Sequence, residues 1–259
     1  MPTTIAVETE GRVARLTLDR PQVHNAFNAD MIRELRAALA ALRADEDVRV
    51  VVLSGRGRSF CAGADLNWMR EIVRYSYEQN LEESLALADF LYELYAFPKP
   101  TVARVAGAAI GGGAGFLSAC DIVVAEAGAQ FGLSEVKIGL VPACIAPYVV
   151  RRTGEGRARR FFLTGERFDA DRAVEIGLVD AVAPAGGLDT EVDAIVGRLL
   201  SSGPEALTKC KELLRRVPGM DFAEARRYTA EMIAGLRVSP EGQEGMAAFL
   251  EKRKPKWHV

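Results

Sequence analysis

The sequence predicts an α/β protein whose last third is helical. Along the first part of the chain, apolar runs with the two-residue period of strands alternate with helical stretches. Strands that alternate with helices favour an α/β fold. From about residue 189 the patterns are helical only, and they are broken at Gly203-Pro204, Pro218-Gly219 and Ser239-Pro240. We therefore expect a strand-rich core over 1–195 and a helical region over 196–259.

The first segments predict a hairpin, a helix and a buried strand. Alternating residues over 5–8 and 13–18 flank a turn at Glu10-Gly11, which is typical of a strand pair. Asn28 can cap a helix because its side chain can accept from the free amides at a helix start. Apolar residues at three- and four-residue intervals predict the inner face of this helix: Met31, Ile32, Leu35, Leu39 and Leu42. The run 50–53 is continuously apolar, as in a buried strand.

The middle of the chain repeats an order of strand, turn and helix. A long helical stretch, 77–95, is stopped by Pro98 and Pro100, which lack the amide that a helix needs. A strand over 101–105 then leads through a glycine-rich turn into a helix of small residues over 114–119. The next predicted elements are a strand at 121–125 and helices at 134–139, 156–163 and 169–176.

Composition indicates an ordinary globular protein. Of the 259 residues, 49% are hydrophobic and 26% are charged, which is enough for a proper core. The net charge of −2 indicates neither nucleic acid nor an anionic membrane as a partner. The four cysteines show no CxxC spacing, which favours free thiols in a reducing compartment. Because no leader pattern and no apolar run of about 18 residues is present, we expect a cytoplasmic protein.

Two glycine turns carry the strongest functional signal. The segment 109–115 holds three consecutive glycines between an apolar run and a helix, and the segment 60–65 makes a similar turn after another apolar run. Amides at a helix start lack partners and point along the helix dipole, so they attract negative charge. Two such turns could place two N–H donors on one oxygen. The sequence therefore predicts an oxyanion hole built from main chain.

Other catalytic arrangements are disfavoured. A dinucleotide fingerprint that began at Gly111 would need a glycine where Phe116 stands. No phosphate loop of the form G-x-x-x-x-G-K-[ST] is present. The only histidines are His24 and His258, which form a poor metal pair and lie near no nucleophile turn. We therefore expect no metal, and acid–base chemistry must fall to carboxylates.

Glu135 differs from most acidic residues because its neighbours are largely apolar, among them Phe131, Leu133, Val136 and Ile138. A carboxyl desolvated there would have a raised pKa, which suits proton transfer near neutral pH. Alternatively, Glu135 is a glutamate in the first turn of a helix capped by Ser134, stabilised by the helix dipole. The local sequence leaves both interpretations open.

Taken together, motifs along nearly the whole chain resemble the enoyl-CoA hydratase/isomerase (crotonase) family. Each motif is weak alone, and their order is specific. The segments that carry the resemblance are Arg20-Pro21, Asn25-Ala26, 59–66, 100–103, 105–113, Cys120-Asp121, Phe131-Gly132, 135–137, 139–142, 173–179 and 244–253.

The resemblance implies a spiral of ββα repeats, a helical carboxyl-terminal region for trimerisation, and trimers that often pair into hexamers. It implies an acyl-CoA thioester as the substrate, so coenzyme A enters as part of the substrate and no other cofactor is expected. The amides of Ala64 and Gly112 would hold the thioester oxygen. Glu135 matches the family's second catalytic glutamate, which exchanges a proton with the carbon next to the thioester.

The resemblance also implies a set of substrate-binding residues. Arg58 matches a basic position near the CoA phosphates, and Phe249 and Lys252 lie where family members close the CoA site of a neighbouring subunit. The remaining positions implied to bind substrate are Ala62, Asp65, Leu66 and Gly111. Taken from its local sequence alone, Asp65 is a turn or cap residue, because aspartate satisfies nearby amides in such turns.

One departure from the family bears on the reaction. Hydratases of this family usually carry another glutamate where this chain has Gly115, and the loop 143–147 lacks the family's usual glycines. With one carboxylate the chain could be a Δ3,Δ2-enoyl-CoA isomerase, which needs no water. Alternatively, the missing side chain makes room for a bulkier or charged acyl group, and Glu135 alone handles both water and proton.

We favour the hydratase, because the segment 134–170 and the ending 237–245 look like bacterial methylglutaconyl-CoA hydratase-type proteins. A third hypothesis is a CoA-ester-binding or RNA-binding relative that has lost activity. The acidic isoelectric point, near 5.9, and the presence of Glu135 weigh against it.

Overall fold

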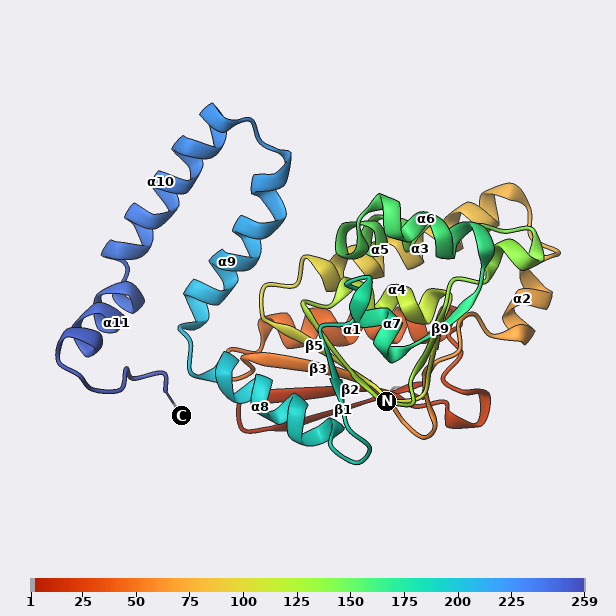
Figure 1. Ribbon diagram of the computed structural model, residues 1–259, viewed down its shortest axis with the longest axis horizontal. Coiled ribbons are helices and arrows are strands. Elements are labelled where there is room, and N and C mark those ends of the chain that lie inside the picture. Colours follow the sequence, from red (N-terminus) through yellow and green to blue (C-terminus); the bar gives the residue numbers. More distant parts are fainter. Residues whose placement is uncertain (1–2, 259) are drawn as a thin grey trace.

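A computed structural model describes residues 3–258 and confirms the α/β class (Figure 1). Its larger sheet has six strands in the order β1-β2-β3-β5-β7-β10. Only the β1–β2 hairpin is antiparallel, and the other neighbours run parallel. The strands are β1 (Ile5–Glu10), β2 (Val13–Leu18), β3 (Val50–Gly55), β5 (Thr101–Val105), β7 (Ile122–Glu126) and β10 (Ala181–Ala183).

A second sheet has four short strands in the order β4-β6-β8-β9. They are β4 (Ser59–Cys61), β6 (Ala108–Ile110), β8 (Gln130–Gly132) and β9 (Arg167–Asp169). Each successive strand pair, β3–β4, β5–β6 and β7–β8, gives one strand to each sheet before the chain enters helical structure. The chain therefore winds as a spiral of ββα repeats, as the family resemblance implies.

The large sheet is buried on both faces, and this explains the continuous apolar run in β3. Val51 and Leu53 face the main core, which the helices of the spiral cover, whereas Val50 and Val52 pack under α8 (Leu188–Leu200).

The two sheets and the helices that cover them form the body of the molecule. Its helices are α1 (Ala29–Ala44), α2 (Leu66–Ile72), α3 (Tyr77–Tyr95), α4 (Gly112–Ala119), α5 (Ala146–Thr153), α6 (Glu155–Thr164), α7 (Ala170–Glu175) and α8, with short 3-10 turns at η1 (Pro21–Val23) and η2 (Glu135–Ile138).

Three further helices form an arm that extends away from the body (Figure 1). They are α9 (Pro204–Arg216), α10 (Phe222–Val238) and α11 (Pro240–Leu250), with the 3-10 turn η3 (Val217–Gly219) between the first two. The breaks predicted at glycine and proline are confirmed. The predicted boundary at 195/196 falls inside α8, whose residues pack on the sheet, and the arm begins at Pro204.

The segment 134–139, predicted to be helical, contains only the 3-10 turn η2. Helices α2 and α5 and the strands of the small sheet were not predicted. All four cysteines are free, as expected. No helix among residues 3–258 is both long and apolar enough to cross a membrane.

Candidate active site

The two glycine turns lie against each other because β4 and β6 are neighbours in the small sheet. Cys61 pairs with Ala109 in parallel register, so the turns that follow both strands leave the same edge. A Cβ atom placed on Gly113 would lie 2.3 Å from the carbonyl oxygen of Cys61, and one on Gly63 would lie 3.2 Å from that of Ile110. Glycine is therefore required at Gly113 for the backbones to approach this closely.

Both turns leave backbone amides without a protein partner among the described residues, and the amides of Ala64 and Gly112 are among them. In the first turn, the amide of Phe27 donates to Gly63 at 2.9 Å and that of Asp65 donates to Phe27 at 2.8 Å. In the second turn, the amide of Gly111 donates to Gly132 at 2.8 Å. Across residues 3–258, no backbone oxygen accepts from Ala64 or from Gly112. Two free donors, one at the start of α4 and one in the neighbouring turn, suit an oxygen that gains negative charge.

Phe27, which the sequence analysis missed, joins the two donors. Its backbone forms an isolated bridge with Ala64, and its ring lies under Gly112, where an added Cβ would come within 2.4 Å of Cε1. The ring is buried and packs on Trp68 and Phe116, with centroids 5.7 Å and 5.2 Å away. The neighbouring Asn25-Ala26 motif was the available signal for it. Phe27 therefore holds both turns in place.

The carboxylate of Glu135 lies beside the second turn, at Gly111. A Cβ placed on Gly111 would be 3.0 Å from Glu135 Oε1, and Gly111 adopts a φ of 54° that glycine tolerates best. The Oε2 atom is buried and has no hydrogen-bond partner among the described residues. Burial raises the pKa of Glu135 above its ordinary value, because the charged form loses hydration. Ser134 makes no side-chain cap, so the geometry favours the desolvated carboxyl over the cap interpretation.

Asp65 serves the fold, and its carboxylate is not free to bind substrate. Oδ1 caps α2 by accepting from the amide of Asn67 at 2.7 Å, and Oδ2 pairs with Arg20 at 2.7 Å. Burial opposes ionisation, but the hydrogen bonds from Arg20 and from the helix amides outweigh it, so the pKa of Asp65 is lowered. The cap interpretation is confirmed, and the substrate-binding role that the resemblance implies for Asp65 stays a prediction.

The other residues implied to bind substrate are spread over two regions. Arg58, Ala62 and Leu66 are exposed around the first turn, with Leu66 70% accessible. Phe249 and Lys252 belong to the arm, which lies well apart from α4 in the same chain (Figure 1). The chain therefore does not bring its own arm to its own two turns, and closure of a neighbouring subunit's site stays a prediction.

Gly115 is buried in α4, and its missing side chain does not leave room for an acyl group. A Cβ atom placed there would lie 2.1 Å from Ile145 Cγ2 and 2.7 Å from Ile145 Cβ. Ile145 is 3% exposed and directly precedes α5. The expectation of vacated space is therefore wrong, because Ile145 fills it.

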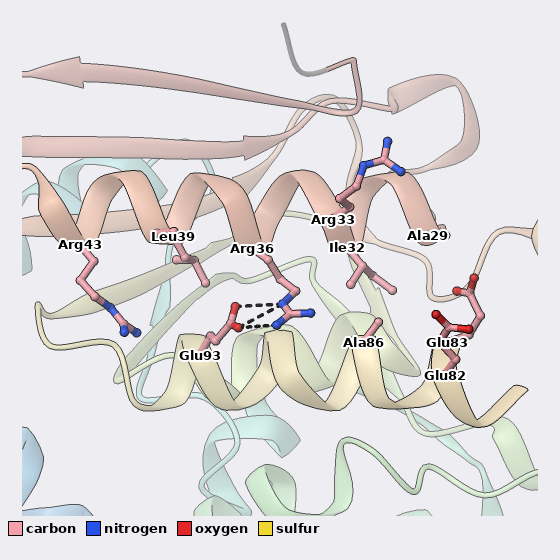
Figure 2. Close-up of a pocket in the computed structure, with 11 residues that line it drawn as sticks. Ala29, Ile32, Arg33, Arg36, Leu39, Arg43, Glu82, Glu83, Ala86 and Glu93 are labelled. Carbon is pink, nitrogen blue, oxygen red and sulfur yellow. Dashed lines mark hydrogen bonds and ion pairs between the residues drawn. The ribbon is translucent and has the colours of Figure 1, made fainter. Parts of the chain in front are cut away.

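A groove lies between α1 and α3 (Figure 2), and none of the residues that line it belongs to the two glycine turns. It encloses about 630 Å³ above an apolar floor that includes Ile32 and Leu39. Arg36 reaches across it to Glu93 at 2.7 Å and to Asp89 at 3.4 Å. These ion pairs tie α3 to α1, so the groove has a structural explanation.

The fold and this site define a class: a ββα spiral that presents two free main-chain donors and a half-buried glutamate whose Oε2 atom is buried. The family model described as enoyl-CoA hydratase/isomerase matches residues 8–259. The chain belongs to this enoyl-CoA hydratase/isomerase family, whose members act on acyl-CoA thioesters.

Solved structures and curated relatives agree with this assignment. The crystal structure of an enoyl-CoA hydratase from Shewanella pealeana has a TM-score of 0.96 and 42% identity, and the match covers 99% of this chain and 96% of that one. The Pseudomonas aeruginosa protein AtuE has a TM-score of 0.96 and 39% identity over 99% and 100% of the two chains. A crotonyl-CoA hydratase from Syntrophomonas wolfei is 34% identical over 253 residues, which are 96% of each chain.

Proposed function

We propose that the protein is a hydratase that adds water across the C2–C3 double bond of a 2-enoyl-CoA thioester. The observation that carries this proposal is the pair of free amides at Ala64 and Gly112 beside the buried carboxylate of Glu135. Relatives named as hydratases over nearly the full length of the chain support the same reaction.

In the proposed reaction the thioester oxygen accepts from Ala64 and Gly112. Water bonds through its oxygen to C3, and the π electrons of the double bond move to the thioester oxygen, which forms an enolate. Glu135 takes a proton from the water and delivers a proton to C2 as the enolate collapses. Both amides strengthen their hydrogen bonds as the oxygen gains charge, and loss of one such donor typically costs about 10²–10³ in rate.

Glu135 has the properties that this role requires. Burial raises its pKa, so its carboxylate is a stronger base toward the attacking water than an exposed one. The unpartnered Oε2 offers an acceptor for the attacking water. We therefore assign both the base and the acid role to this one residue.

We further propose that the substrate is a branched or carboxylated 2-enoyl-CoA of the methylglutaconyl-CoA type. In this proposal Arg58 lies near the CoA phosphates, and Phe249 and Lys252 close the site of the neighbouring subunit in a trimer or hexamer. The exposed apolar side chains of the arm, including Phe222 and Leu250, support such an assembly. We propose a cytoplasmic enzyme with neither a nucleic acid nor a membrane partner and with no metal or separate cofactor.

A Δ3,Δ2-enoyl-CoA isomerase is the second candidate, and the contact between Gly115 and Ile145 favours it. An isomerase needs one group that removes a proton from C2 of a 3-enoyl thioester and returns it to C4. Glu135 alone could make both transfers, and no water has to be held against hydrocarbon.

A panel of thioesters separates these functions. We expect purified protein to remove the enoyl absorbance of crotonyl-CoA or 3-methylglutaconyl-CoA. If neither changes but a 3-enoyl-CoA is converted, the protein is the isomerase. If no thioester turns over although an acyl-CoA binds, the non-catalytic hypothesis holds instead.

A further inference from the structure

The direction of the free Ala64 amide is set by the pairing of its neighbours with Phe27. In a parallel bridge, the groups that flank the bridged residue point toward the partner strand, and the residue's own amide points away from it. The carbonyl of Gly63 accepts from the amide of Phe27 at 2.9 Å, and the amide of Asp65 donates to the carbonyl of Phe27 at 2.8 Å. The Ala64 amide therefore points away from Phe27, and whatever fixes the backbone of Phe27 also fixes this donor.

Just before Phe27, the backbone adopts a conformation that is uncommon for residues with a side chain. His24 has a φ of 53° and Asn25 a φ of 55°, and only one other non-glycine residue within 3–258 has a positive φ. Residues in this left-handed region are less stable than in the ordinary regions, and they persist where the surrounding structure holds them. The turn that leads into Phe27 must therefore be held by specific contacts.

The side chain of Asn25 supplies these contacts. It is fully buried, and its Nδ2 atom donates to the carbonyl oxygens of Arg56, at 2.9 Å, and of Ser59, at 2.7 Å. Its Oδ1 atom accepts from the amide of Arg20 at 2.9 Å. Ser59 begins β4, the strand that leads into the first glycine turn. One side chain therefore ties the segment before Phe27 to the strand before Ala64.

From this arrangement we infer that Asn25 is a positioning residue for the main-chain donor at Ala64. The inference rests on the proposed function, because it concerns the amide that would hold the thioester oxygen. Asn25 acts through Phe27, whose backbone it delivers to the bridge with Ala64. Without the two Nδ2 hydrogen bonds the left-handed turn can relax, and the Ala64 amide then turns away from the oxygen. Small displacements of this kind lower rates strongly, because the donor must be in place before the reaction.

Infrared spectroscopy of a bound thioester tests the inference. Butanoyl-CoA labelled with carbon-13 at the thioester carbonyl has no double bond to hydrate, so it stays intact in the site. Hydrogen bonds to the carbonyl oxygen weaken the C=O bond and lower its stretching frequency relative to the free ligand. In Asn25→Asp an oxygen replaces the Nδ2 donor and faces two carbonyl oxygens. We expect this variant to keep less than about half of the lowering seen in the parent protein.

Steady-state rates with the best thioester of the panel give a second readout. We expect Asn25→Asp to lower kcat by about 10- to 100-fold with KM within about threefold of the parent, because a misdirected donor mainly loses stabilisation of the enolate. The control is Asn80→Asp, since Asn80 Nδ2 also donates to two carbonyl oxygens, those of Tyr75 at 3.3 Å and Ser76 at 3.0 Å. The control should keep the parent's band position and a kcat within about twofold of the parent.

A full lowering of the frequency in Asn25→Asp would overturn the inference even if the variant is less stable, because reduced stability alone does not redirect an amide. The same loss in Asn80→Asp would overturn it as well. If Asn25→Asp does not fold, Asn25→Gly decides the question, since glycine tolerates the left-handed φ and removes the same donors. If the parent protein itself shows no lowering, the two amides do not hold the thioester oxygen, so the proposed function fails and the inference fails with it.

Discussion

Helices α4 and α10 show how differently the two regions of this molecule are built. In α4 every residue after the first is buried, and the backbone approaches neighbouring strands so closely that glycine is required. In α10 none of the 17 residues is buried, and Phe222 at its start is 96% exposed. Helix α4 therefore completes its packing within one chain and positions chemistry with its backbone, whereas α10 leaves apolar side chains uncovered, and we propose that a neighbouring subunit covers them.

The largest expected effect concerns the buried carboxylate of the body. We expect Glu135→Gln to lower kcat/KM by about 10²–10⁴, because the variant can neither accept nor donate the proton. The matched change in the arm, Glu231→Gln, removes an exposed partner of Arg227 and should leave the rate within about twofold of the parent. Steady-state rates with the best thioester of the panel check both. An unchanged rate in the Glu135→Gln variant would contradict the assignment of Glu135 as both the acid and the base.

The next effect compares two ion pairs. Arg20→Ala leaves the Asp65 carboxylate, which is 5% accessible, without its cation, so we expect a loss of about 3–5 kcal/mol in the free energy of unfolding. Arg227→Ala in the arm breaks a pair whose side chains are 83% and 63% accessible, and should cost less than about 1 kcal/mol. Urea unfolding of both variants measures the difference. Similar losses would contradict the distinction drawn between body and arm.

A smaller effect links the stability of the body to pH. Because burial raises the pKa of Glu135 above its ordinary value of 4.5, the folded chain binds this proton more tightly than the unfolded chain does. Its contribution to stability is therefore present below pH 4.5 and is lost as pH rises through the folded pKa. We expect Glu135→Gln to exceed the parent in Tm by about 2–4 °C at pH 8 and by less at pH 5.

The pH dependence of kcat/KM should report the ionised form of Glu135. The base must be ionised to accept a proton from water, so kcat/KM of the parent should fall as pH drops below this raised pKa. A rate that stays constant down to pH 4.5, or a Tm difference that is equal at both pH values, would show that burial does not perturb Glu135.

The smallest effect on stability is expected at the tip of the arm. Phe222→Ser should change the free energy of unfolding by less than about 0.5 kcal/mol at a concentration where the chain is monomeric, because the side chain has no cover within its own chain. The same substitution should shift the sedimentation equilibrium toward smaller species if the arm mediates assembly. A large loss of monomer stability would mean that the arm packs on its own body.

Long periodic segments were predictable from the sequence, and three-residue elements were not. The helix 77–95 was predicted with its observed bounds from its helical pattern and the two prolines that follow it, and the structure adds a capping box of Ser76 and Gln79 at its start. The strands of the small sheet hold three residues each, which is too few to show a period. Helix α2 was missed although Asp65 was interpreted as a turn or cap residue, because the helix that it caps has only seven residues.

The parts of the site that lie within short stretches of sequence were predictable. The glycines of both turns and the apolar surroundings of Glu135 stand within short stretches of sequence. The fit between Gly115 and Ile145 could not be predicted, because residues 30 positions apart meet only after α4 and α5 have packed. The same holds for Phe27, whose ring supports Gly112 from a distant segment.

The central claim is that amides from two separate turns converge on one thioester oxygen while a single carboxylate serves the neighbouring carbon. A crystal structure of the protein with a bound, unreactive acyl-CoA tests it most directly. We expect a thioester oxygen within about 2.7–3.1 Å of the nitrogens of both Ala64 and Gly112, with the Glu135 carboxylate facing C2. A thioester oxygen bound elsewhere, or a Glu135 side chain turned into solvent, would contradict it.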